Sequence, residues 1–328
     1  MVHIILYAIV PILVIMLLGY YSGKSGAFTG DNARTLNKVV LNYALPAALF
    51  ISIIKANREM LSVDVKLTII SFVVLMACFF LVYYVFRLVY KDSIAESAIS
   101  ALISGSPTIG FLGFAVLQPI FGDSASVGLV IAIVAIEVNA LGIPIGLALL
   151  NAGRAKTAAA AAGDTAKPNP WKPVLDAIKE PVAWAPILAV VLVLCGLKWP
   201  AYLDPSFKLI SGANASVAVF AAGITLSSVK ISINGQAIMG SFLKLIVMPL
   251  ALLVVGMLCH MDPTNLKMLV VCGALPPAFS GIIIASRYNC YVATGTSSLA
   301  LSTLLFMGFC PLWIWLTDLA LKWFPYAV

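Results

Sequence analysis

Long apolar stretches separated by short polar loops run along almost the whole chain. Ten stretches contain no Asp, Glu, Lys or Arg, apart from single interruptions at Glu137 and Lys244. They cover residues 2–23, 39–54, 67–86, 97–122, 124–153, 181–197, 209–229, 231–261, 268–286 and 288–317. A membrane-spanning helix needs about 20 apolar residues, and a charge at its centre costs roughly 2.5–3.5 kcal/mol. The pattern therefore predicts an all-α polytopic membrane protein with ten transmembrane helices.

Composition agrees with a protein that spends most of its length in lipid. Of its 328 residues, 62% are hydrophobic and 10% are charged, whereas a soluble domain is about 45–50% apolar and about 25% charged. This excludes a soluble α/β enzyme, a secreted disulfide scaffold and a disordered or fibrous protein. The net charge of +7 does not indicate a nucleic-acid partner, because the Lys and Arg residues are scattered and form no basic stripe.

The distribution of Lys and Arg predicts the orientation in the membrane. If the N-terminus faces outward, the inward loops hold twelve Lys or Arg residues and the outward loops hold seven. The positive-inside rule then favours both termini outside, in a multi-pass protein of the cell (inner) membrane. The first apolar run has no preceding Lys or Arg and no small-residue cleavage site, so it is interpreted as a span and not a signal peptide.

The longest polar stretch, Asn151–Lys172, divides the predicted spans into five and five. We interpret it as a cytoplasmic linker. Because five is odd, two homologous halves would have opposite topology, as in many secondary transporters. The expected organisation is a first five-helix repeat over residues 1–150, a linker over 151–172 and a second, inverted five-helix repeat over 173–328. Residues that match between the halves by ordinal span are Pro11 with Pro186, Asn42 with Asn214, Pro107 with Pro276, and Pro144 with Pro311.

The fourth and ninth predicted spans each contain proline beside small residues. The fourth reads SGSPTIG over residues 104–110 and the ninth reads LPPAFSG over 275–281. Proline removes a backbone donor and disfavours helix at the residue before it, so we expect two broken helices, with ordinary proline kinks as the alternative. Unpaired backbone in lipid is tolerated only where protein or a water-filled cavity satisfies it.

A broken span offers an anion site, because its second half-helix begins with free N–H groups and a positive dipole end. In an inverted repeat, the two such ends meet at one point, which suits a carboxylate. The candidate substrate-binding residues are Ser106, Pro107, Thr108, Ile109, Gly110, Pro276, Pro277, Ala278, Phe279 and Ser280, together with Asn42 and Asn214. For the two asparagines, a hydrogen bond across helices is the alternative to substrate binding or ion coordination.

The stretches SPTIGFLGFAVLQPIFG and LPPAFSG, with ten spans and a central loop, resemble the auxin efflux carrier family, part of the superfamily of bile acid/sodium symporters. Within it the chain looks most like the bacterial malonate carriers. The resemblance implies two inverted repeats that form a scaffold domain and a transport domain. It also implies that the fourth and ninth helices cross beside the substrate, at Pro107 and at Pro276 and Pro277. Plant members carry Asn-Pro at the crossover, and here serine and threonine hydroxyls replace those amides.

Further polar residues within the spans are candidates for coupling or charge compensation. Glu137 and Asn139 lie near the middle of the fifth span. A lone carboxyl in a low dielectric favours its neutral form, so Glu137 is a candidate proton carrier, with a structural acid as the alternative. Lys244 in the eighth span faces an anionic substrate, pairs with Glu137 or snorkels to the surface. Arg287 ends the ninth span as an interfacial anchor or a substrate ligand.

Two GxxxG pairs, Gly19 with Gly23 and Gly142 with Gly146, permit close helix packing. Packing within the protomer is the simpler interpretation, and a homodimer is the alternative. The lipid bilayer is the other expected partner.

These features favour a secondary active transporter of a small carboxylate, with malonate as the leading candidate, that works by alternating access coupled to H⁺ or Na⁺. No Walker motif supports direct ATP hydrolysis, and no cofactor or metal is expected. The alternatives are an anion channel or an efflux carrier for another organic acid. An intramembrane serine enzyme is disfavoured, because His3 and His260 lie near the outer face whereas Ser297 lies near the inner end of its span.

Overall fold

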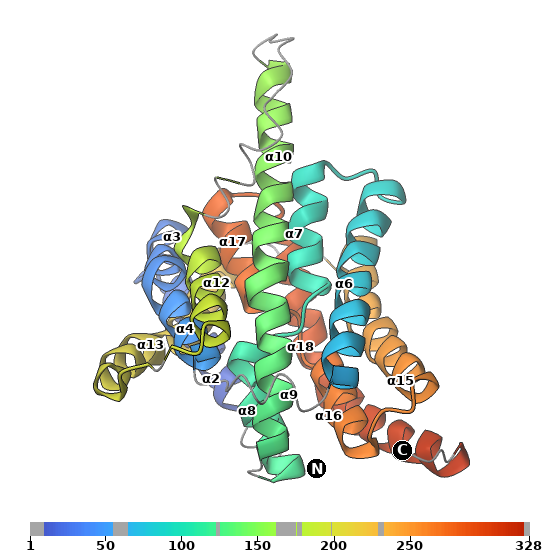
Figure 1. Ribbon diagram of the computed structural model, residues 1–328. Helices are drawn as coiled ribbons and strands as arrows, with labels where there is room; N and C mark the ends of the chain where they lie inside the picture. Colours follow the sequence, from blue (N-terminus) through green and yellow to red (C-terminus); the bar gives the residue numbers. More distant parts are fainter. Residues whose placement is uncertain are drawn as a thin grey trace.

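The structure is a computed structural model that describes residues 10–54, 65–122, 125–161, 175, 179–197, 199–228 and 233–324. Every named element within these ranges is a helix (Figure 1). The elements are α2 (Val10–Lys24), α3 (Gly30–Val39), η2 (Val40–Ala44), α4 (Leu45–Ile54), α6 (Val65–Leu88), α7 (Ile94–Ser104), α8 (Ile109–Phe121), α9 (Ala125–Ile136), η3 (Glu137–Gly142), α10 (Ile143–Ala161), α12 (Pro181–Leu194), η4 (Ala201–Leu203), α13 (Asp204–Ser228), α14 (Gly235–Phe242), η5 (Leu243–Val247), α15 (Met248–Leu258), α16 (Pro263–Ala274), α17 (Phe279–Tyr288) and α18 (Val292–Trp323).

Five continuous helical runs in the described ranges are long and apolar enough to cross a membrane. They are Val65–Leu88, Ser126–Ala159, Ala201–Ser228, Gly235–Leu258 and Val292–Trp323. These runs correspond to the third, fifth, seventh, eighth and tenth predicted spans, so the chain is a polytopic membrane protein. The other predicted spans coincide with shorter helices or with pairs of half-helices, and the total of ten spans stays a prediction.

The helices fall into two groups, and each group contains helices from both halves of the chain. The peripheral bundle consists of α2, α3, η2, α4, α12 and α13, in which α13 packs extensively on α2 and α12 on α4. The central bundle consists of α6 to α10 and α14 to α18, in which α7 lies against α6 and α10, and α18 lies against α14 and α16. Figure 1 shows the peripheral bundle at the left of the molecule.

Glycine allows the closest helix pair of the peripheral bundle to form. A Cβ atom added at Gly19 of α2 would lie 2.1 Å from the backbone oxygen of Phe220, and one added at Gly223 of α13 would lie 2.2 Å from that of Met16. Gly23 continues this seam against Ser227. The first GxxxG pair therefore packs within the protomer, and this contact leaves the prediction of a homodimer untested.

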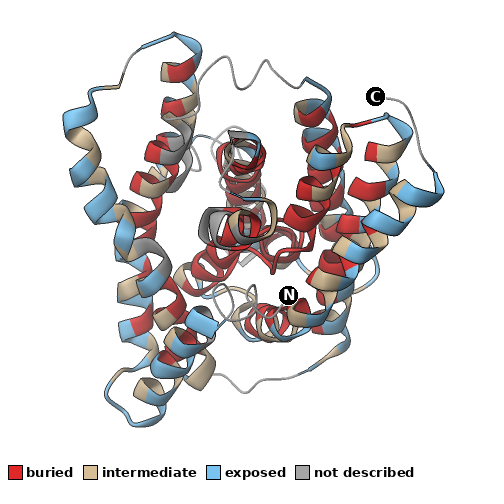
Figure 2. Cartoon of the chain, turned by 90° about the horizontal axis from the view of Figure 1, so that it is seen from below, coloured by how far each residue is buried: buried red, intermediate tan, exposed pale blue. Residues whose placement is uncertain are grey.

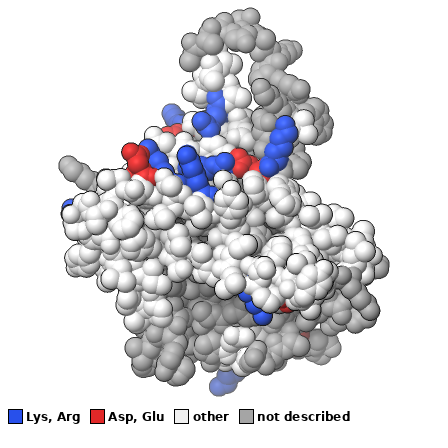
Figure 3. Space-filling model, turned by 90° about the vertical axis from the view of Figure 1, so that its left-hand side faces the viewer, with Lys and Arg blue, Asp and Glu red and all other residues white. Residues whose placement is uncertain are grey.

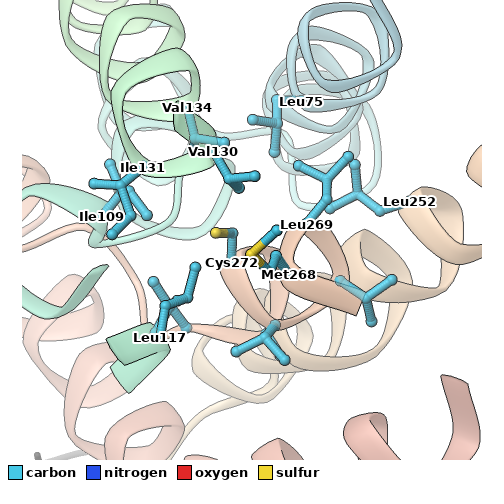
Figure 4. Close-up of a cluster of buried hydrophobic side chains, with 14 of the residues drawn as sticks. Leu75, Ile109, Leu117, Val130, Ile131, Val134, Leu252, Met268, Leu269 and Cys272 are labelled. Atoms are coloured by element: carbon cyan, nitrogen blue, oxygen red, sulfur yellow. The ribbon is translucent and has the colours of Figure 1, made fainter. Parts of the chain in front are cut away.

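Buried side chains concentrate where the half-helices meet the long helices of the central bundle, as the view from below shows (Figure 2). The largest hydrophobic cluster joins α6, α8, α9, α15, α16 and α18. Within it Leu75, Val130, Leu269 and Cys272 converge from three helices (Figure 4). This packing fixes α16, and therefore the end of its broken span, within the protein.

Charged side chains gather at one end of the molecule, around the base of the projecting part of α10, above a broad uncharged band (Figure 3). Side-chain contacts join α3 and α10 to the end of α17 here, and we call this region the α10 end. Arg34 donates a hydrogen bond to Asn289, and the guanidinium of Arg154 lies 4.9 Å from the centre of the Tyr288 ring. An uncharged band beside a charged rim is the surface that a bilayer requires.

The glycine seam generates a stability prediction. Gly223→Ala places a methyl group against the backbone of α2, and such overpacking costs roughly 1–3 kcal/mol. We expect a lower thermal unfolding midpoint in detergent. Gly212→Ala on the same helix is the control, because an added Cβ atom meets nothing within 4 Å there. Equal midpoints for the two variants would show that the seam does not depend on glycine.

Candidate functional site

Both predicted breaks are present. In the first half, α7 ends at Ser104 and α8 begins at Ile109. In the second half, α16 ends at Ala274 and α17 begins at Phe279. Four residues are therefore non-helical in each span, at the positions where proline interrupts the hydrogen-bond ladder.

The two non-helical segments pair with each other, and we call this paired region the crossover. Pro107 and Pro277 form an antiparallel bridge. Because neither proline has an N–H group, their neighbours donate: Thr108 N–H to the oxygen of Pro276, and Ala278 N–H to that of Ser106, each at 3.1 Å. Each broken helix thus satisfies part of the backbone of the other, as a low-dielectric interior demands.

The α8 and α17 helices both begin directly after this bridge. The first intrahelical bond of α8 runs from Leu112 N–H to the oxygen of Thr108, so the N–H groups of residues 109–111 lie before the ladder. The first turn of α17 has the same position after Ala278. Two positive helix ends therefore lie beside one another within the protein.

Hydroxyl groups surround the crossover. Ser106, Thr108 and Ser280 are all buried, with exposed fractions of 4%, 2% and 4%. Thr108 is the N-cap residue of α8, but its side chain does not cap the helix, and its Oγ1 has no hydrogen-bond partner among the described residues. A buried hydroxyl without a partner is costly, so it marks a place where a ligand oxygen would be stabilising.

Ile109 and Phe279 contribute backbone and not side chain to this site. Both side chains are 1% exposed and pack into hydrophobic clusters. Gly110 lies in the first turn of α8. At Gly281 an added Cβ atom would lie 2.8 Å from the backbone of Leu102 and Ile103. Glycine there lets α17 approach α7 closely enough for the crossover to form.

Glu137 is buried in the central bundle with an exposed fraction of 4%. Its Oε1 accepts a hydrogen bond from Ser71 Oγ at 2.6 Å, and its Oε2 has no partner in the described part of the chain. Asn139 instead donates to the backbone oxygen of Ala135 in its own helix, at 2.8 Å. Glu137 therefore keeps one oxygen available, whereas the amide of Asn139 is used locally. Sequence reasoning missed Ser71.

Lys244 neither snorkels to the surface nor pairs with Glu137, which corrects two of the interpretations offered for it. The residue is fully buried, and its Nζ donates to the backbone oxygen of Gly273 at 2.6 Å. It also contacts Met248 Sδ at 3.1 Å. The side chain turns inward because α16 ends beside it and presents carbonyl groups that lack helical partners.

Three π-helical segments hold polar residues singled out from the sequence. Asn42 lies in η2, Glu137 and Asn139 lie in η3, and Lys244 lies in η5. Wide turns of this kind occur often at functional sites, since they displace one residue from the regular ladder. The oxygen of Leu245 in η5 accepts a hydrogen bond from Nε1 of the buried Trp313 of α18 at 2.7 Å. No residue pattern in the sequence predicts these π-helical segments.

Comparison with known proteins identifies the family. The membrane transport protein family profile matches residues 4–314. The chain is 56% identical over 311 residues to the uncharacterized transporter YfdV of Escherichia coli strain K12, covering 95% of this chain and 97% of that one. It is 23% identical over 315 residues to the uncharacterized transporter MJ1031 of Methanocaldococcus jannaschii, covering 93% and 96%.

The chain belongs to the membrane transport protein family. This is the auxin efflux carrier family that its crossover motifs resemble. The protein is therefore a membrane transporter and not an enzyme. The names of these relatives state no substrate.

In this transporter Asn42 and Asn214 are not seen to join the crossover. Asn42 is half-buried and lines an apolar groove of about 310 Å³ with Phe50, Trp184 and Phe207, in the peripheral bundle. The described lining of this groove contains no crossover residue. Asn214 lies in α13, and its side-chain surroundings fall outside the described part of the structure.

Arg287 links the two bundles at the α10 end. Its guanidinium forms an ion pair with Glu180 at 2.6 Å, and Tyr288 donates to the other oxygen of Glu180 at 3.2 Å. Glu180 is the N-cap residue of α12 in the peripheral bundle, whereas Arg287 lies in the last turn of α17 in the central bundle. These contacts fit the interfacial anchor and offer nothing in favour of a substrate ligand.

A double-mutant cycle tests this link. Glu180→Gln and Arg287→Gln, singly and together, should give a coupling energy of roughly 0.5–1 kcal/mol in thermal unfolding, because the side chains are only 18% and 25% exposed. The exposed pair Asp31 and Arg34, at 86% and 47%, is the control and should couple by less. Coupling no larger than in the control pair would contradict an inter-bundle role.

Proposed function

We propose that this transporter is a secondary active carrier of a small carboxylate, with malonate as the first candidate, that works by alternating access coupled to H⁺ or Na⁺. One observation carries the proposal. Two broken helices direct their N-terminal ends to a shared crossover that contains a buried hydroxyl without a partner. Paired positive helix ends favour an anion, and secondary transporters with broken helices bind anionic substrates in this way.

The chemistry of the crossover favours a carboxylate. Its polar atoms are backbone N–H groups and the hydroxyls of Ser106, Thr108 and Ser280, which donate to carboxylate oxygens. The resemblance to bacterial malonate carriers makes malonate the first acid to test. At the position before Pro107, plant auxin carriers have an asparagine amide and this chain has the hydroxyl of Ser106, so the donor groups differ and do not favour auxin as the substrate.

The arrangement of the bundles supports a carrier more than an anion channel. The crossover hydroxyls are buried among the described residues, as expected for a carrier whose site is closed to water in this state. In the proposed cycle, the central bundle acts as the transport domain and moves past the peripheral bundle as a scaffold. The Glu180–Arg287 ion pair would then hold one state closed at the α10 end, which we assign to the cytoplasm of a cell whose inner membrane contains the protein.

The inverted repeat belongs to the same proposal. The first half, residues 1–150, supplies α2 and the continuous run from α3 to α4 to the peripheral bundle, and the second half, residues 173–328, supplies α12 and α13. In each half a long helix, a broken span and a further long helix of the central bundle follow. An odd number of spans per half would give the halves opposite topology and would orient α8 and α17 against one another. With the α10 end assigned to the cytoplasm, both termini would face outward.

Counterflow in liposomes tests the proposed function. Purified protein is reconstituted with unlabelled malonate inside, and uptake of labelled malonate is competed by a panel of mono- and dicarboxylates. We expect saturable counterflow that a subset of short acids inhibits. Malonate uptake that does not saturate and needs no internal acid would indicate a channel, and stronger inhibition by another acid than by unlabelled malonate would make that acid the preferred substrate.

Thr108→Val tests the unpartnered hydroxyl. The variant removes no hydrogen bond seen in the structure, so the thermal midpoint should be unchanged or higher. Loss of a hydroxyl that binds a carboxylate costs roughly 1.5–3 kcal/mol, which corresponds to about a tenfold or larger increase in the KM of counterflow. Thr317→Val is the control, because this buried Thr317 hydroxyl bonds within its own helix, to Trp313, far along α18. An unchanged KM would remove Thr108 from the site.

Glu137→Gln tests proton coupling. Glutamine keeps an oxygen that can accept from Ser71 but cannot gain or lose a proton, and a buried lone carboxyl is suited to that exchange. We expect counterflow to continue, whereas accumulation driven by an imposed pH gradient falls to the level seen without a gradient. Asp318→Asn, a half-exposed carboxylate near the end of α18, should behave as wild type. Unchanged gradient-driven accumulation in Glu137→Gln would assign coupling elsewhere.

A further inference from the structure

Lys244 places an ammonium group at the C-terminal end of a broken helix. Its Nζ donates to the oxygen of Gly273 at 2.6 Å, and Gly273 is the residue before Ala274, the last residue of α16. Lys244 is fully buried. It reaches α16 from η5, where the wide turn directs it inward between α6 and α16.

The end of α16 needs such a donor. The last carbonyl groups of a helix have no intrahelical partner, and together they carry a partial negative charge of roughly half an electron. Leu275 N–H lies within hydrogen-bond distance of the oxygens of Val271 and Cys272. The next carbonyl, that of Gly273, is satisfied by Lys244. The ammonium therefore completes the negative end of α16, next to the crossover.

Transporters with broken helices commonly place a coupling sodium ion at this kind of end, where backbone carbonyls coordinate it. Besides the Gly273 oxygen, the Lys244 ammonium contacts Met248 Sδ at 3.1 Å among the described residues. Sulfur groups are poor ligands for a hard cation, which takes oxygen. While Lys244 is in place, its amine uses the Gly273 oxygen and Met248 Sδ is a poor ligand, so the position does not suit a metal ion beside the ammonium.

Glu137, the other charged residue that interrupts a predicted span, does not form an ion pair with Lys244. Glu137 accepts a hydrogen bond from Ser71 of α6, whereas the Lys244 ammonium donates to the Gly273 oxygen of α16. The ammonium accordingly acts on the helix end and not as half of an ion pair.

We propose that the Lys244 ammonium is a built-in cation that takes the place of a coupling sodium ion at the end of α16, so that this carrier moves its carboxylate without sodium. This inference rests on the proposed function as a secondary carrier. It leaves the proton as the coupling ion and makes Lys244 a residue that determines which ion is used.

The test compares wild type, Lys244→Ala and Lys208→Ala in NaCl and in choline chloride at equal ionic strength. Lys208 is exposed on α13 and serves as the control for loss of a lysine. Thermal midpoints are measured in detergent without substrate, and counterflow of labelled malonate is measured in liposomes. Lys244→Met, which keeps the volume and removes the charge, separates a loss of charge from a cavity.

Wild type and Lys208→Ala should have the same midpoint and the same initial rate in both salts. Counterflow by Lys244→Met and Lys244→Ala should fall about tenfold or more in choline, the loss expected for about 1.4 kcal/mol. The space opened in Lys244→Ala beside the Gly273 oxygen should admit sodium. Binding to the folded state then raises the midpoint, so NaCl should raise it above the choline value and restore part of the counterflow.

Wild-type counterflow that requires sodium, or a wild-type midpoint that NaCl raises above choline, would overturn the inference. Wild-type rates of Lys244→Met in choline would overturn it as well. The thermal arms need no substrate, so they judge the sodium claim even if no acid shows counterflow. Failure of counterflow with every acid would instead count against the proposed function.

Discussion

The structure depends on the pairing of two interrupted helices within the membrane domain. An unpaired backbone amide or carbonyl costs several kcal/mol in hydrocarbon, so neither break would be stable alone. The bonds from Thr108 N–H to the oxygen of Pro276 and from Ala278 N–H to that of Ser106 satisfy each break with the other. Because both partners are needed at once, α7, α8, α16 and α17 must pack together. The glycine at 281 and the hydrophobic cluster around α16 make that approach close enough.

The same pairing creates an electrostatic pattern that suits transport. The two helices that start at the crossover present positive ends beside each other, whereas the helices that stop there present negative ends. Lys244 satisfies a carbonyl at the negative end of α16, and a backbone oxygen near the end of α7, that of Ile103, accepts from Ala278. The positive ends and the hydroxyl of Thr108 remain for a ligand. Membership of a transporter family and this pattern together lead to the proposed carboxylate carrier.

Features with a local cause were predictable from the sequence. Charge-free runs identified the five long membrane helices, and the prolines at 107, 276 and 277 identified both breaks, because proline acts on its own turn. Features that depend on packing were not predictable. The π-helical segments, the Ser71 partner of Glu137 and the inward direction of Lys244 arise from which helices become neighbours. Asn42 matches Asn214 by its ordinal span, but a position in the sequence does not show its neighbours, which form an apolar groove.

The most direct measurement is a structure of the carrier determined with saturating bromomalonate, or with the brominated form of the acid that counterflow identifies. The account predicts a carboxylate at the crossover, with its oxygens within hydrogen-bond distance of Thr108 Oγ1 and of N–H groups in the first turn of α8 or α17. Bromine located in the groove of the peripheral bundle, with the crossover closed as it is here, would contradict the central claim.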